Sequence, residues 1–87
     1  MEQEERFSKE AIHLIYKITE HLKNLYDEGK LLVYITNILY RVPELSLSTP
    51  IQEIGQVLEK GEPINSKLIV YSAIEIYKKL PQGPTDD

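Results

Sequence analysis

The sequence KLLVY at residues 30–34 recurs as KLIVY at residues 67–71, and the likeness continues into the residues that follow. Between the windows 30–41 and 67–78, five of twelve positions are identical and three more are conservative exchanges, without a gap. Because a repeated unit determines the architecture of a chain, the repeat predicts two similar halves, each a helical hairpin. A chain rich in Leu, Ile, Lys and Tyr also matches itself by chance, so duplication stays a hypothesis.

The length and composition limit the class of protein. The chain has 87 residues, no cysteine and a formal net charge of −4. A single domain of this size buries only about 60 to 65% of the surface of its unfolded chain, and it has no disulfide or thiolate metal site to reinforce it. The abundance of Glu, Lys, Ile and Tyr is typical of proteins from hot environments. The acidic balance argues against a broad nucleic-acid-binding surface.

The chain begins with an acidic segment, and its longest uninterrupted apolar run is 31–35. That run is too short to span a bilayer, and the acidic start does not resemble a secretory signal. We therefore expect a soluble cytoplasmic protein that does not bind membranes.

Apolar residues recur at intervals of three and four in the first part of the chain, which predicts an amphipathic helix. Ser8 is suited to cap its N-terminus, and Gly29 is suited to stop it. The predicted buried stripe consists of Phe7, Ala11, Leu14, Ile18, Leu22 and Leu25.

The second segment, 31–42, is apolar at nine of its twelve residues. It ends before Pro43, which disfavours helical geometry in the residue that precedes it. Val33, Tyr34 and Ile35 favour sheets, so a strand is the alternative. A helix is the better interpretation, because twelve residues without a turn signal are long for a strand.

The segment 43–50 is predicted to be an extended connection whose leucines, Leu45 and Leu47, pack on the core. Thr49 as the N-cap, Pro50 at the first helical position and Gln52 three residues after the cap predict the start of a third helix there.

A glycine and a proline delimit the last two helices. Gly61 is suited to end the third helix in a left-handed conformation. The fourth helix is predicted to begin at Pro63 or Ser66 and to end at Leu80, before Pro81.

These segments predict an all-α fold, a small four-helix domain made of two helical hairpins over 1–80, with a disordered acidic tail at 81–87. We expect the two most apolar helices, the second and the fourth, to pack on one another between the two amphipathic helices. The fourth helix would still carry apolar residues outside that contact. Part of its circumference should therefore face a partner.

The chain has six tyrosines but only one phenylalanine and no tryptophan. Tyrosine suits a surface that is dry in a complex and wet without one, although a tyrosine at the margin of a core is the simpler interpretation for any single residue. We predict a non-catalytic protein–protein interaction module, a homodimer or an accessory subunit, that binds through an apolar, tyrosine-rich face of the second and fourth helices. The predicted partner-binding residues are Tyr34, Tyr40, Ile69, Tyr71, Ile76, Tyr77 and Leu80.

No arrangement of residues suggests catalysis. Glu10 and His13 have the spacing used in carboxylate di-iron bundles, but the motif occurs once and His13 projects away from the apolar stripe. No catalytic triad pattern or glycine-rich phosphate loop is present in the sequence. We expect no enzyme activity, no metal and no cofactor; a small apolar ligand between the helices is a further possibility.

A helix-turn-helix DNA-binding regulator is the alternative function. Residues 49–60, 61–64 and 65–79 have the sizes of its first helix, turn and recognition helix. Asn65, Ser66 and Lys67 would then lie at the end of the second helix that touches bases. The apolar residues 69–70, 74 and 76 leave this helix little polar face, and the chain is acidic.

Overall fold

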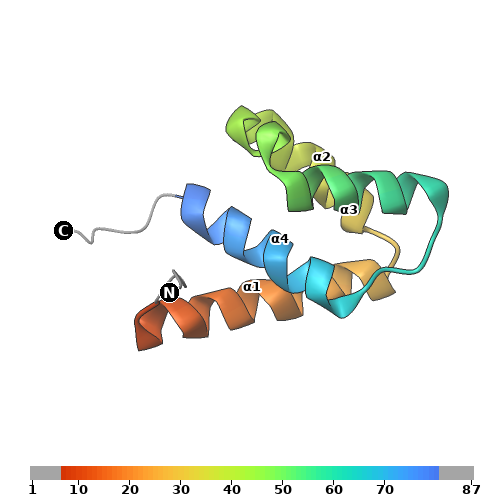
Figure 1. The fold of residues 1–87 in the computed structure, drawn as a ribbon. Helices are drawn as coiled ribbons and strands as arrows, with labels where there is room; N and C mark the ends of the chain where they lie inside the picture. Colours follow the sequence, from red (N-terminus) through yellow and green to blue (C-terminus); the bar gives the residue numbers. More distant parts are fainter. Residues whose placement is uncertain (1–6, 81–87) are drawn as a thin grey trace, which may run out of the picture.

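The structure is a computed structural model that describes residues 7–80. These residues form four α-helices and one 3-10 turn (Figure 1), and no strand is present between residues 7 and 80. The elements are α1 (Lys9–Asp27), α2 (Leu31–Arg41), η1 (Pro43–Leu47), α3 (Thr49–Lys60) and α4 (Ser66–Lys79). The prediction of a small all-α four-helix domain is confirmed, and the helical interpretation of 31–42 is right. The tail predicted at 81–87 lies outside the described residues.

Local hydrogen bonds fix the two ends of α1 as the sequence predicts. The Ser8 hydroxyl accepts a hydrogen bond from the Ala11 backbone N–H at 3.1 Å. At the other end Gly29 has a φ of 75°, and the Lys30 N–H donates to the carbonyl of Leu25 at 2.8 Å. A glycine in the left-handed conformation turns the chain so that the next N–H can donate to a carbonyl that the helix end leaves without a partner. The chain reverses there and enters α2.

The start of α3 differs from its prediction by one residue. The N-cap is Ser48, whose hydroxyl accepts from the Ile51 N–H at 3.4 Å, and Thr49 is already helical. The Gln52 side chain does not close a capping box but donates to the Ser46 carbonyl at 2.7 Å. Because Pro43 starts a 3-10 turn, the connection before α3 is compact and not extended as predicted.

The end of α3 and the start of α4 follow the predicted signals. Gly61 has a φ of 73°, and the Glu62 N–H bonds back to the Val57 carbonyl at 3.1 Å. The Asn65 side chain then caps α4 by accepting from the Lys67 N–H at 2.7 Å. Of the two predicted starting residues, Ser66 is the first residue of α4.

α4 lies between α1 and α3 and runs antiparallel to both (Figure 1). α2 packs on α3, η1 and α1, and its backbone does not approach that of α4 closely. The prediction that the second and fourth helices pack on one another is therefore wrong. Ser72 and Ala73 of α4 are fully buried, and their small side chains let neighbouring helices come close.

The core takes apolar side chains from every element. Its fully inaccessible members include Leu22 of α1, Leu45 of η1, Ile54 of α3 and Ile76 of α4. Along α1 the buried stripe is shifted from its prediction, because Ile15 is buried at 8% exposure and Leu14 is 44% exposed. Three-four periodicity alone does not distinguish two apolar residues that stand next to each other at the edge of a stripe.

The leucines of η1 give a test of this core. Leu45 is 0% exposed and Leu47 is 80% exposed, so only one of the two pins the connection as predicted. Leu45→Ala should lower the free energy of unfolding by roughly 2 to 5 kcal/mol, because it leaves a cavity. Leu47→Ala should change it by less than about 0.5 kcal/mol. Urea unfolding of both variants measures the difference, and equal losses would contradict this packing.

Two glycines give a second matched pair. Gly61→Ala should destabilise the protein by roughly 1 kcal/mol, since a Cβ is strained at its positive φ. A Cβ on Gly55, in the interior of α3, meets no atom within 4 Å. Gly55→Ala should therefore stabilise the protein by up to about 1 kcal/mol through helix propensity. Thermal unfolding should show opposite shifts for the two variants, and shifts of the same sign would show that α3 ends or packs differently.

Candidate functional site

The seven predicted partner-binding residues do not form one face. Ile69 and Ile76 are 5% and 0% exposed, so they have almost no side-chain surface to offer a partner in this fold. Tyr77 is partly buried, and its ring meets the ring of Phe7 edge-to-face with centroids 6.2 Å apart. Tyr71 is 53% exposed and lies along the groove between α3 and α4. The remaining three, Tyr34, Tyr40 and Leu80, line a common cleft.

This cleft lies between the C-terminal half of α2 and Leu80, the C-cap residue that follows α4. It has a volume of about 520 Å³. Its wall on α2 comes from Tyr34, Ile38 and Arg41, whose spacing of four and three residues places them on one side of a helix. We call it the Tyr34 cleft, and it is lined by Tyr34, Asn37, Ile38, Tyr40, Arg41, Val42 and Leu80.

Tyr34 is the half-buried aromatic residue of this cleft. Its ring packs edge-to-face on the imidazole of His21 in α1, with centroids 5.4 Å apart. Burial raises the pKa of the Tyr34 phenol above its ordinary value of about 10, while the Arg41 guanidinium opposes the rise. The phenol is therefore neutral near pH 7, and its hydroxyl can donate as well as accept a hydrogen bond.

Arg41 is the cation of the cleft. It is the last residue of α2, where the helix dipole favours a positive charge. The ion pairs between side chains of the described part of the chain are Lys23–Glu20 at 3.8 Å, Lys30–Glu28 at 3.6 Å and Lys78–Glu75 at 3.9 Å. None of them involves Arg41. Within residues 7–80 its guanidinium thus has no carboxylate partner.

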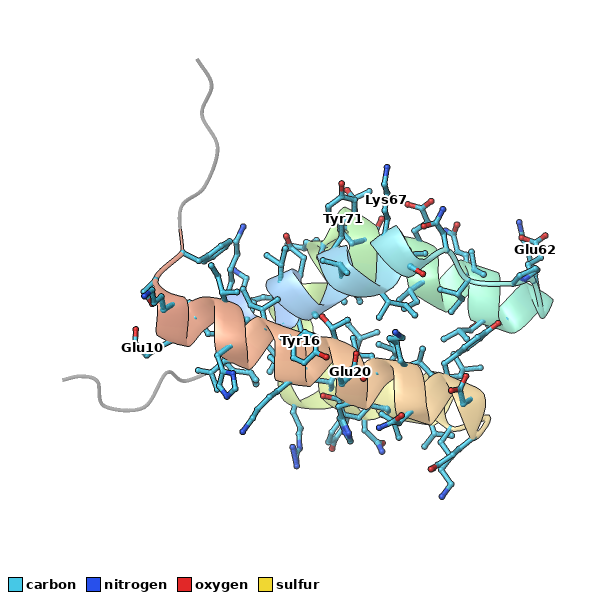
Figure 2. The ribbon with its side chains drawn as sticks, turned by 90° about the horizontal axis from the view of Figure 1, so that it is seen from below. Glu10, Tyr16, Glu20, Glu62, Lys67 and Tyr71 are labelled. Carbon is cyan, nitrogen blue, oxygen red and sulfur yellow. The ribbon has the colours of Figure 1, made fainter. Side chains whose placement is uncertain are left out.

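A second surface follows the line of contact between α1 and α4. Ile12 and Tyr16 are 57% and 60% exposed and lie four residues apart on α1; Val70, 38% exposed, and the partly buried Ile74 have the same spacing on α4. With Phe7 beside Tyr77 in an antiparallel helix pair, residue 14 of α1 is level with Val70, so Val70 lies between Ile12 and Tyr16 along the helix axes. We call these four residues the α1–α4 seam. Figure 2 shows Tyr16 on the visible face of α1, whereas Tyr71 and Lys67 point away from α1.

Ile12 and Tyr16, the α1 half of this seam, are not among the residues predicted from the sequence to bind a partner. Ile12 and Tyr16 are off the apolar stripe of α1, and their spacing of four residues was the signal that a second apolar face exists. Asn37 and Arg41 are two of the three polar residues in the otherwise apolar segment 31–42, and that pattern predicts no role for them. Nothing in the sequence places them beside Leu80, because that approach depends on how α2 and α4 are arranged.

The residues of the helix-turn-helix alternative are exposed at the start of α4. The side-chain Oδ1 of Asn65 is engaged as the helix cap, because it accepts from the Lys67 N–H. The groove that Lys67 lines also contains Glu53 of α3. A carboxylate at this position repels phosphate, so the surface is not a basic one.

Residues 7–80 contain neither a cluster suited to hold a metal ion nor a helix suited to span a membrane. His13 is exposed, and no three His, Cys, Asp or Glu side chains of the described residues are grouped so that they could hold a metal ion. Within the same part of the chain, no helix combines the length and apolar character needed to cross a membrane.

Comparisons of this chain with protein families, with curated proteins and with solved structures find no match. Its function therefore has to be inferred from the cleft and the seam. These surfaces differ in chemistry, because the cleft combines a cation with tyrosines and the seam is formed by apolar side chains and one tyrosine.

The Tyr34 phenol predicts a pH dependence. Its pKa is raised in the folded state, so the unfolded chain loses this proton first as the pH rises above about 10. The stability that the neutral, buried phenol provides is complete below that pH and is lost as the pH rises through the folded-state pKa. The free energy of unfolding, measured with urea, should therefore fall less for Tyr34→Phe than for the wild type when the pH is raised from neutral to strongly alkaline. Equal losses would mean that the Tyr34 phenol is solvated.

Proposed function

We propose that this chain is a non-catalytic protein–protein interaction module, a homodimer or an accessory subunit of a larger intracellular assembly. It would dock through the α1–α4 seam. The observation that carries the proposal is the exposure of Ile12 and Tyr16, both more than half exposed and four residues apart on α1, the helix that packs along α4. Burial of such side chains against a partner is favourable by about 25 cal/mol per Å² of apolar surface.

The side chains of Ile12 and Tyr16 are not part of the core. Ala11 and Ile15 already fill the contact of α1 with the rest of the domain, and they are 4% and 8% exposed. The seam is thus a second apolar face on a helix whose first face is already buried. In a soluble helix, positions opposite or beside the buried stripe are ordinarily polar.

The form of the seam suits a helical partner. An amphipathic helix could lie along the two antiparallel helices and place its apolar face on these side chains. Tyr16 can bury its ring there and keep its hydroxyl in contact with water. Glu20 and Lys23, paired at 3.8 Å on the same helix, would contribute to the polar rim that surrounds most interfaces.

Other exposed apolar residues are distributed differently. Tyr40 is 88% exposed on α2, and Leu47 is 80% exposed on η1. Neither belongs to the antiparallel helix pair that forms the seam. Their exposure has a local explanation, because single exposed apolar side chains are normal on protein surfaces.

The seam can be tested with two tyrosine variants. We expect the wild type either to associate with itself at high concentration or to remain monomeric and bind a hydrophobic dye. Tyr16→Glu should abolish whichever of these occurs, since it places a charge in the seam. Tyr40→Glu, the matched change on α2, should leave self-association unchanged. Because Tyr40 lines the Tyr34 cleft, Val33→Glu, at a residue of α2 that is 63% exposed and outside that cleft, is the control for dye binding. Sedimentation velocity over a range of concentrations and dye fluorescence measure the two effects.

Two results would contradict the proposal. A wild-type chain that stays monomeric at high concentration and binds no dye would exclude an exposed apolar docking face. A loss of association in Tyr40→Glu but not in Tyr16→Glu would place the interface on α2.

A further inference from the structure

We propose that the Tyr34 cleft is a binding site for a small organic acid, a carboxylate joined to an apolar body. The carboxylate would pair with Arg41, and the apolar body would lie against Ile38, Val42 and Leu80. This inference goes beyond the interaction module, because no residue of the α1–α4 seam takes part in it. The two functions can therefore be tested separately.

The size and lining of the cleft are those of a small-molecule site. Its volume of about 520 Å³ is within the range of small-molecule sites, which is about 300 to 1,000 Å³. Such sites have mostly apolar walls and a few polar groups that converge on the ligand. Here Ile38, Val42 and Leu80 form the apolar part, and the rings of Tyr34 and Tyr40 extend it.

The polar groups of the cleft select the charge of the ligand. The Arg41 guanidinium presents donors in a planar fork that matches a carboxylate, and it has no carboxylate partner within residues 7–80. Asn37 adds an amide that can donate a further hydrogen bond, and the Tyr34 hydroxyl is a donor as long as the phenol is neutral. Among residues 7–80, no Asp or Glu lines the cleft. An anion is therefore favoured over an amine.

Three other cavities of the described residues do not share this combination. The groove between α2 and α3, about 310 Å³, is lined by Glu59 and by no cation. The cavity beside Gly29 and Gly61, about 290 Å³, is lined by Glu62 and by no cation. In the α3–α4 groove, about 250 Å³, Lys67 faces the same space as Glu53. The Tyr34 cleft is larger than each of them, and its lining from the described part of the chain combines a cation with no acidic residue.

The probes are 3-phenylpropionate and hexanoate, with the neutral amide of each acid as its control. Titration of the 15N-labelled full-length chain near pH 7, followed by amide chemical shifts, should show saturable binding of one or both acids in the millimolar range. The largest shifts should map to residues 34–42 and to Leu80. The amides should bind at least several-fold more weakly, because they lack the charge that pairs with Arg41.

Arg41→Gln tests the anchor. Arg41 is exposed at the end of its helix, so the variant should keep the fold, and the dispersion of its amide spectrum checks this. We expect a loss of about tenfold in affinity for the acids and little change for the amides, in line with a charge-assisted hydrogen bond at a partly exposed site. Lys60→Gln is the matched control, because Lys60 is the last residue of α3 and lines none of these cavities. It should bind like the wild type.

Several outcomes would overturn the assignment. Equal affinity of acid and amide, or of wild type and Arg41→Gln, would show that Arg41 does not recognise the carboxylate. Shifts centred on Tyr16 and Val70 would place binding on the seam. The absence of saturable shifts with both acids would show that the cleft is not a site for this class of ligand.

Discussion

The position of α4 between α1 and α3 is the constraint on which the rest of the molecule depends. Neighbouring helices approach a helix most closely where its side chains are small, and Ser72 and Ala73 are both 0% exposed at the middle of α4. Ser72 is the buried polar residue of the core, and its hydroxyl has no hydrogen-bond partner among the described residues. An unpartnered buried hydroxyl is unfavourable by about 1 to 3 kcal/mol. Its presence indicates that small size matters more than apolar character at this contact.

Both surfaces described above follow from this arrangement. Because α1 and α3 cover two sides of α4, Ile69 and Ile76 point into the core, and Val70 is left at the edge of the contact with α1. Because of the direction in which α4 runs, Leu80, its C-cap residue, lies beside α2 and completes the lining of the Tyr34 cleft. The core fills the space between the four helices, and the α1–α4 seam and the Tyr34 cleft lie at its edges.

The sequence predicts what local chemistry decides. Ser8, Gly29 and Gly61 mark helix ends because their effects involve only neighbouring backbone groups, and the four helices follow from apolar spacing. What it does not predict is which side of a nearly all-apolar helix faces inward, since that depends on the other helices. Tyr34 and Tyr71 illustrate the limit, because they are equivalent in the repeated sequence yet one lines a cleft and the other lies along the α3–α4 groove. Whether the repeat records a duplication stays a hypothesis.

The edge-to-face contact between Phe7 and Tyr77 has a consequence for how this domain can be joined to others. It holds the beginning of α1 beside the last turn of α4, so the described chain enters and leaves the fold at the same end of the molecule (Figure 1). A domain with adjacent entry and exit points can be inserted into a surface loop of a host protein without separating the two strands of that loop. The seam and the cleft would then be carried outward as a compact lobe, with the host fold left intact.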